Sequence, residues 1–181
     1  MTFESVSLPL DKDRLVRFLI SENWPFHVNS RLSKEKVLGM IAEGTFDGSN
    51  HESFWIQDEL KNEIGFIRLF DLDDIDDGYP LFDLRIRAEY RGRSLGKAAV
   101  QWLTRYLFEK HPHLERVAGT TRADNLSMRK VFQASGYAKE GHFRKDWASL
   151  NGECFDTVKY GILREDWVSG TTTPVRWNDE P

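Results

Sequence analysis

Apolar and polar residues alternate over several segments of the chain, which is the pattern of half-buried strands. Residues 81–87 alternate strictly, and Phe82, Leu84 and Ile86 share the apolar face. The same reading predicts strands at residues 3–8, 52–58, 63–70, 81–87, 115–121, 137–147 and 153–163. Because short polar turns join several neighbours, we expect a largely antiparallel sheet.

Between these strands, apolar residues recur at helical spacing of three and four. Helices are predicted at residues 11–20, 33–43, 95–110 and 125–135. Ser33 is a good N-cap for the second helix, and either Asp124 or Asn125 caps the fourth. Gly44 and Gly136 are placed to end their helices. The predicted order is strand, two helices, three strands, helix, strand, helix and two strands.

A glycine-containing turn at residues 90–98 joins the strand at 81–87 to the third helix. Gly92 and Gly96 let the backbone approach a ligand closely, and the first N–H groups of a helix have no intrahelical partner. With the helix dipole, such a turn is suited to a pyrophosphate. A turn that binds nothing remains the alternative.

Two familiar nucleotide-binding loops do not fit this turn. A P-loop needs four residues between its glycines and a hydroxyl residue after the lysine, whereas here only residues 93–95 intervene and Ala98 follows. The dinucleotide fingerprint fails because Gly92 and Gly96 are three residues apart and no third glycine follows. A nucleotide hydrolase is therefore disfavoured.

Composition limits the class of protein. The chain has 181 residues, 40% hydrophobic, and we expect one domain at residues 1–168 with a C-terminal tail at 169–181. A net charge of −4 offers no general attraction to nucleic acid or anionic lipid. No apolar run approaches the ~18 residues of a membrane span, and the first residues lack a signal-peptide pattern, which predicts a cytoplasmic protein. Cys154 is the single cysteine and is expected to be a small buried residue.

Two loops carry candidate substrate chemistry. Trp24 and Phe26 lie in an aromatic loop whose rings either cap the core or line a substrate pocket. Residues 71–80 hold five aspartates between Asp71 and Asp77, as a solvated connection or an acidic lip that attracts a cationic substrate. The spacing does not match an EF-hand, and we expect no metal site.

Two separated motifs resemble a known family. Arg91 to Gly96 resembles the phosphate-binding loop of the GNAT superfamily of acyl-CoA-dependent N-acetyltransferases, and Asn125 to Tyr137 resembles its later motif, in which an asparagine opens a helix that ends at Gly-Tyr. The resemblance implies an α/β (α+β) fold with a mixed, mostly antiparallel sheet of about seven strands. It implies helices on both faces and a splay between the fourth and fifth strands. Residues 155–163 look like the subgroup that acetylates ribosomal-protein N-termini, along with related resistance and polyamine enzymes.

The resemblance also implies acetyl-CoA as cosubstrate, with its acyl-pantetheine arm between the splayed strands. The residues it assigns to the cofactor are Leu84, Ile86, Arg91, Gly92, Arg93, Ser94, Leu95, Gly96, Lys97 and Asn125. Ser94 stands where the family usually has a glycine. A serine still supplies an N–H group, but it favours a negative φ.

The implied reaction is direct attack of a neutral amine on the thioester carbonyl, with a backbone N–H near residues 84–86 for the oxyanion. Asp83 is the candidate base and substrate contact, against the alternative of an ion-paired surface carboxylate. Glu63 and Asp71 are weaker candidates. Many relatives have Tyr and Ser where Phe132 and Met128 stand, so no general acid is predicted.

The neighbouring hydroxyl of Ser127 is one position away from Met128 and should point elsewhere on the helix. The predicted acceptor is a small cationic amine or a peptide N-terminus, with no nucleic-acid or membrane partner, and a homodimer is possible by analogy with relatives. A CoA-binding module that has lost catalysis is the alternative function.

Overall fold

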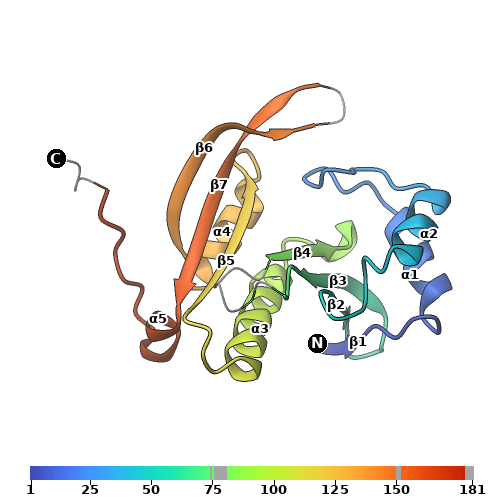
Figure 1. Cartoon of the computed structure of the whole chain (residues 1–181), viewed down its shortest axis with the longest axis horizontal. Coiled ribbons are helices and arrows are strands. Elements are labelled where there is room, and N and C mark those ends of the chain that lie inside the picture. The colour runs from blue at the N-terminus through green and yellow to red at the C-terminus, as the bar shows by residue number, and fades with distance from the viewer. Residues whose placement is uncertain (74, 76–80, 150–151, 178–181) are drawn as a thin grey trace. The chain divides into compact units, whose positions relative to one another are not determined.

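The structure is a computed structural model that describes residues 1–73, 75, 81–149 and 152–177 of the chain. It contains two compact units, an N-terminal unit of Met1–Ile75 with Pro80–Leu95, and a C-terminal unit of Gly96–Pro181 with Asp76–Tyr79. Figure 1 labels the elements along the chain. Seven strands lie in the described residues, and the order of strands and helices is the predicted one up to the last strand.

Four antiparallel strands form the sheet of the N-terminal unit in the order β1-β2-β3-β4. The strands are β1 (Thr2–Ser5), β2 (Glu52–Gln57), β3 (Glu63–Phe70) and β4 (Leu81–Ile86). β1 is shorter than predicted, and β3 has the predicted bounds. β4 is the last strand of this sheet, so one of its edges has no strand partner there.

Helices α1 (Lys12–Ile20) and α2 (Lys34–Ala42) bury their apolar stripes in the core of this unit. As predicted, Ser33 caps α2, and its Oγ accepts a hydrogen bond from the Lys36 N–H at 3.2 Å. The core gathers apolar residues from both helices, the loop between them and strands β2 and β3: Leu15, Val16, Phe18, Leu19, Trp24, Leu32, Val37, Phe46, Trp55 and Phe66.

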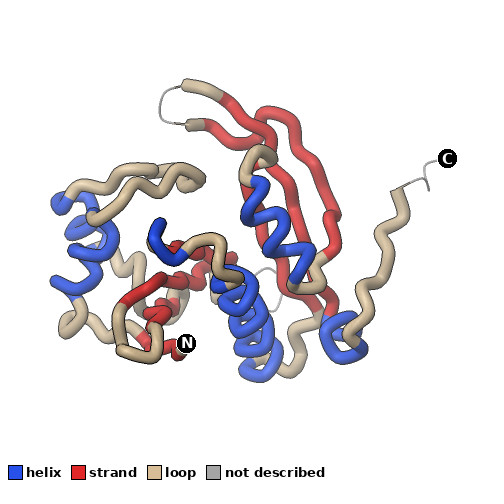
Figure 2. Tube along the Cα trace, turned by 180° about the vertical axis from the view of Figure 1, so that it is seen from behind, coloured by secondary structure: helices blue, strands red, loops and turns tan. Residues whose placement is uncertain are grey.

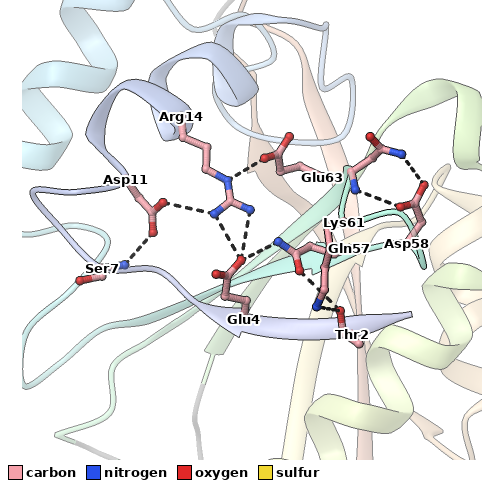
Figure 3. A network of polar contacts seen from close by, with 10 residues as sticks. Thr2, Glu4, Ser7, Asp11, Arg14, Gln57, Asp58, Lys61 and Glu63 are labelled. Atoms are coloured by element: carbon pink, nitrogen blue, oxygen red, sulfur yellow. Dashed lines mark hydrogen bonds and ion pairs between the residues drawn. The ribbon is translucent and has the colours of Figure 1, made fainter.

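A guanidinium on α1 ties this helix to the sheet (Figure 3). Arg14 contacts Glu63 at 2.7 Å, Asp11 at 3.2 Å and Glu4 at 3.3 Å. Its guanidinium carbon also lies 4.4 Å from the centre of the Trp55 ring. Three carboxylates from β1, β3 and the start of α1 therefore converge on one cation, and Glu63 is committed to this network.

The C-terminal unit holds a second sheet, of three strands in the order β5-β7-β6. The strands are β5 (Arg116–Arg122), β6 (Ala138–Ala148) and β7 (Cys154–Leu163). Its helices are α4 (Leu126–Ala134), α5 (Arg164–Ser169) and α3 (Leu95–Lys110), whose first residue belongs to the N-terminal unit. In Figure 2, α4 lies along this sheet. β5 ends the sheet, as β4 ends the other.

Aromatic packing holds α4 to its sheet. Phe132 is fully buried and stacks on Tyr160 of β7, with ring centres 4.9 Å apart and planes 11° from parallel. Tyr137 also packs against Phe132, and its hydroxyl shares a 2.7 Å hydrogen bond with Thr104 of α3. Burial raises the pKa of Tyr137, although the bond to Thr104 opposes this, so this hydroxyl stays protonated as a structural group.

Two features of the C-terminal unit differ from the sequence analysis. Cys154 is exposed rather than buried, because it stands at the first position of β7, beyond the apolar part of the strand. Helix α5 was not predicted, since six residues are too few to show a helical period. Arg164 anchors α5 by donating to the carbonyl oxygens of Leu114 and His111 at 2.8 and 2.7 Å.

The start of the tail is attached to this unit. The Thr173 N–H donates to the carboxylate of Asp166 at 2.8 Å, and the Thr172 hydroxyl donates to the Gly136 carbonyl at 3.0 Å. The division into residues 1–168 and 169–181 stays a prediction.

The Arg14 network gives a test of stability. Replacing Arg14 by Met should lower the free energy of unfolding by about 1–2 kcal/mol, because it removes the shared cation and its stacking on Trp55. Arg17→Met, on the exposed side of α1, is the matched control and should change stability little. Urea unfolding measures both.

The loss should depend on pH. Burial raises the pKa of Asp11, but hydrogen bonds from the Ser7 N–H and from Arg14 outweigh it and hold this pKa below its usual value. A lowered folded-state pKa contributes stability above the unfolded value of about 3.9, and this contribution is lost as pH falls. The difference between wild type and Arg14→Met should therefore shrink below about pH 4. A difference that stays constant down to pH 3 would contradict this account.

Candidate functional site

The open edge of β4 presents backbone groups at two of the predicted cofactor residues. The Arg87 N–H donates to the Ile64 carbonyl of β3 at 2.9 Å. Successive residues of a strand point their N–H and C=O groups to opposite edges, so Leu84 and Ile86 point theirs away from β3. In agreement, the Ile86 carbonyl accepts from a side chain beyond the strand, Arg91 Nε, at 2.8 Å.

Two charged residues fix the turn that follows β4. Besides its bond to Ile86, Arg91 contacts Glu22 at 3.4 Å. The Glu22 carboxylate also accepts the Ala88 N–H at 2.9 Å, at the start of the short helix η2 (Ala88–Tyr90). Glu22 therefore positions the loop, a role that no local sequence pattern indicated because the contact joins residues 66 positions apart.

The loop adopts a conformation that serine rarely takes. Gly92 has φ +77° and Ser94 has φ +60°, so Ser94 is in the left-handed region and the expectation of an ordinary φ there is wrong. The turn into α3 enforces this conformation on an L residue. Within the described ranges, the N–H groups of Gly92, Arg93 and Ser94 donate no hydrogen bond. With the N–H group of Leu95, where α3 begins, they are available to an anion.

Gly96 and Asn125 have structural duties in the C-terminal unit. A Cβ on Gly96 would lie 3.2 Å from the Val131 side chain, so glycine lets α3 pass close to α4. Asn125 is the N-cap of α4, as predicted, because its Oδ1 accepts the Met128 N–H at 3.2 Å. Its Nδ2 donates to Thr121 at 3.0 Å. Lys97 lies in the first turn of α3 and is half-buried.

Asp83 is a charged anchor in a largely buried setting. One carboxylate oxygen lies 2.8 Å from His27 Nε2, and the other accepts from Arg85 at 2.9 Å. Burial raises the pKa of Asp83, but His27 and Arg85 outweigh burial and hold it well below its usual range. The carboxylate is ionised at neutral pH, and its low proton affinity makes it a weak base by itself.

The polar face of β4 is therefore the covered one. Arg85 is only 7% exposed, and its guanidinium carbon lies 5.3 Å from the Trp24 ring centre. Arg87 lies in the same way 4.8 Å from the Phe18 ring. Arginine stems pack well on aromatic rings, which lets these charges lie against the apolar core.

Burial and hydrogen bonding distinguish the remaining candidate residues of the substrate site. Trp24 is 1% exposed, stacks on Phe18 and donates its ring N–H to the Leu19 carbonyl at 2.8 Å, so it belongs to the core. Phe26 is half-buried and is the more accessible ring of the loop. Asp71 has φ +58° and follows β3 directly.

The acidic segment lies only partly within the described residues. Asp74, Asp76 and Asp77 lie outside the described residues, so the acidic lip stays a prediction. Among the described residues, no group of three or more His, Cys, Asp or Glu side chains is arranged to hold a metal ion. No described helix has the length and apolar character needed to cross a membrane.

Helix α4 offers no proton donor at the two positions where relatives have one. Phe132 is fully buried in the aromatic stack, and Met128 is half-buried. Ser127 is exposed, as expected from its place on the helix.

Comparisons with known proteins agree on one family. The family model described as "Acetyltransferase (GNAT) family" matches residues 16–137. An uncharacterised N-acetyltransferase, YnaD of Bacillus subtilis (strain 168), is 26% identical in an alignment of 172 positions that covers 86% of this chain and 96% of that protein.

Solved structures share the fold. A spermidine N-acetyltransferase from Vibrio cholerae in complex with CoA and spermine has a TM-score of 0.75 at 18% identity, and covers 92% of this chain and 97% of its own. A chimera of the Vibrio cholerae enzyme SpeG with hSSAT has a TM-score of 0.73 at 19% identity, over 93% and 99%. These structures are spermidine enzymes, so the expected place among the ribosomal-protein N-terminal acetyltransferases has no support.

The strained serine of the loop can be tested directly. Ser94→Gly should raise the free energy of unfolding by about 0.5–1 kcal/mol, because glycine relieves the positive φ although it makes the unfolded chain freer. Gly92→Ala should lower it by about 1 kcal/mol, since no atom lies within 4 Å of the added methyl group and only the backbone strain remains.

Ser94→Ala is the matched control. It keeps the strain and removes only the hydroxyl group, so its stability should stay near that of wild type. Urea unfolding of the three variants checks the loop conformation, and a Ser94→Gly variant less stable than wild type would contradict it. Acetyl-CoA titration of Ser94→Ala then reports on the hydroxyl group alone.

Proposed function

Since the chain belongs to the acetyltransferase (GNAT) family, we propose that it transfers the acetyl group of acetyl-CoA to a primary amine of a small molecule. One observation carries the proposal. The unpaired edge of β4 runs into a loop whose Gly92, Arg93 and Ser94 N–H groups have no hydrogen-bond partner within the described ranges.

These backbone groups suit the two ends of acetyl-CoA. The loop up to Leu95 would hold the pyrophosphate, with Arg93 adding positive charge. The edge of β4 at Leu84 and Ile86 would pair with the amides of the pantetheine arm. One of these N–H groups then stabilises the oxyanion that forms when the amine attacks the thioester.

Proton removal from the amine is proposed for the pair of His27 and Asp83. Asp83 is ionised and faces His27 Nε2, so this nitrogen carries the proton and Nδ1 has a free lone pair. His27 Nδ1 is buried and has no partner among the described residues. Asp83 thus acts by orienting His27, and His27 accepts the proton.

No acid is needed for the leaving group. With Phe132 and Met128 on α4, CoA leaves as a thiolate or takes a proton from water. A thiolate is a tolerable leaving group because the pKa of a thiol is about 8–9.

The acceptor is proposed to be a small amine. A solved structure of the same fold contains spermine, which supports a small molecule over a peptide N-terminus. The two acceptor classes differ in the assay described next. A catalytically inactive CoA-binding module is favoured only by the missing donors on α4.

Thioester consumption tests the function. The purified protein should release CoA thiol from acetyl-CoA when offered spermidine, spermine, amino acids or short peptides, with a preference for one small-molecule class. Acetyl-CoA binding, measured by calorimetry in parallel, separates the alternatives. Tight binding with no CoA release across the panel, while an active relative turns over in the same assay, contradicts the enzyme and favours the binding module.

Asp83→Asn tests the proton pathway. It should lower kcat about 100-fold and leave the KM for acetyl-CoA nearly unchanged, because general-base catalysis contributes about 10²–10⁴ in rate. The loss should shrink at high pH, where the amine loses its proton without help. Asp13→Asn, an exposed carboxylate on α1, is the matched control.

A variant of His27 completes a double-mutant cycle with Asp83→Asn. If the two residues act as one unit, His27→Gln combined with Asp83→Asn should cost little more than either change alone. Fully additive losses, or a pH–rate profile unchanged by Asp83→Asn, would remove the pair from the mechanism.

A further inference from the structure

Three neighbouring strands of the N-terminal unit bring polar residues together on one face. In the strand register, Ser53 of β2 is opposite Arg68 of β3, and Arg68 is opposite Asp83 of β4. Arg85 is two residues further along β4 and shares the face, and His27 lies against Asp83. We call Ser53, Arg68, Asp83, Arg85 and His27 the arginine cluster.

Several hydrogen-bonding groups of this cluster are buried without a partner. Within the described ranges this holds for Arg68 Nε, Arg85 Nη1 and Ser53 Oγ. Arg85 and Ser53 are 7% and 5% exposed, so water does not replace the missing partners freely. A buried donor without an acceptor is costly, and a protein that keeps three of them side by side has a reason to do so.

Charge in the cluster is also unbalanced. Two guanidinium groups face one carboxylate, Asp83, which already makes its contacts to Arg85 and His27. Burial lowers the pKa of Arg68, and Arg85 adds to this, while Asp83 and Asp71 oppose it. Among the described residues no carboxylate forms an ion pair with Arg68, and one bound monoanion would supply that counter-charge.

Two members of the cluster lie at a partly exposed rim. The side chains of Asp83 and His27 keep 19% and 23% of their surface exposed. The cluster also flanks the proposed acetyl site, because Asp83 and Arg85 are the chain neighbours of Leu84. A group bound there would belong to the acceptor.

We propose that Arg68, Arg85 and Ser53 bind a carboxylate group of the acceptor, so that the acceptor is a zwitterionic amine of the amino-acid type and not a polyamine. This proposal rests on the proposed function. A planar carboxylate matches the fork of a guanidinium donor, and its charge would pair with Arg68, the arginine of the cluster that has no ion pair among the described residues. A polyamine brings further positive charge to Arg68, which forms no ion pair among the described residues, and is repelled.

The test compares each amino acid with its own carboxamide. Phenylalanine and β-alanine are offered beside phenylalaninamide and β-alaninamide, with spermidine as the polyamine, and kcat/KM is measured by CoA release. The amine of a carboxamide has the lower pKa and is the better intrinsic nucleophile near neutral pH. A preference for the carboxylate cannot therefore arise from amine reactivity.

For at least one pair we expect the carboxylate to exceed its carboxamide by about 10- to 100-fold in kcat/KM. In Arg68→Gln and Arg85→Gln this ratio should fall towards one. Because both members of a pair are measured on one preparation, the ratio does not depend on the fraction of folded enzyme. Arg31→Gln removes the same charge from an exposed position of the same unit and should keep the wild-type ratio.

Two outcomes overturn the inference while leaving the proposed function standing. One is efficient acetylation of spermidine with a carboxylate-to-carboxamide ratio near one, and the other is a ratio that the two arginine variants leave unchanged. If no CoA is released with any amine, calorimetric titration of phenylalanine and phenylalaninamide in the presence of CoA shows whether the cluster still binds the carboxylate. Selective binding of the carboxylate without CoA release supports the cluster and refutes catalysis, whereas no selectivity and no release refute both.

Discussion

The antiparallel pairing of β3 with β4 is the interaction on which the rest of the site depends. Its register decides which groups of β4 face the core and which face the free edge. Gly65 makes the close pairing possible, because a Cβ at that position would lie 2.6 Å from the Arg85 carbonyl oxygen. A slip of one residue would exchange the two faces of β4, removing Asp83 and Arg85 from His27 and turning the amides of Leu84 and Ile86 inward.

The same strand thus serves two kinds of chemistry. Its backbone, at the unpaired edge, is suited to the uncharged amide groups of a cofactor arm, while its side chains, on the covered face, are suited to charge. Charged groups can lie on that face because the aliphatic stems of the arginines pack on aromatic rings. Trp24 and Phe18 are therefore functional in an indirect sense, since they let guanidinium groups lie against a hydrophobic core.

Local sequence signals predicted the elements well because those elements depend on neighbouring residues. The bounds of β3 and capping by Ser33 and Asn125 are decided within a few positions, and the structure confirms them. Gly92 also has the positive φ that a glycine in such a turn permits. The resemblance to the family added the fold, because no local pattern of apolar and polar residues specifies a fold.

What the sequence did not reveal depends on contacts between distant positions. The Glu22 carboxylate reaches residue 88, and His27 meets Asp83, with no periodic signal to link them. The conformation of Ser94 was mispredicted because local preference was overruled by the turn into α3. The polar side chains on one face of β4 also suggested a solvent-exposed face, whereas in the structure that face is covered. Residue type alone does not reveal what packs against a strand.

Cys154 is the only thiol of the chain and is exposed at the first position of β7. Any reagent that detects free CoA by its thiol will also react with this side chain. Each protein molecule thus contributes one equivalent of signal before a single turnover, a baseline that scales with protein and not with substrate. The same property makes the position a unique attachment point for a fluorophore or spin label, through which motion of the hairpin formed by β6 and β7 can be followed without introducing a new cysteine.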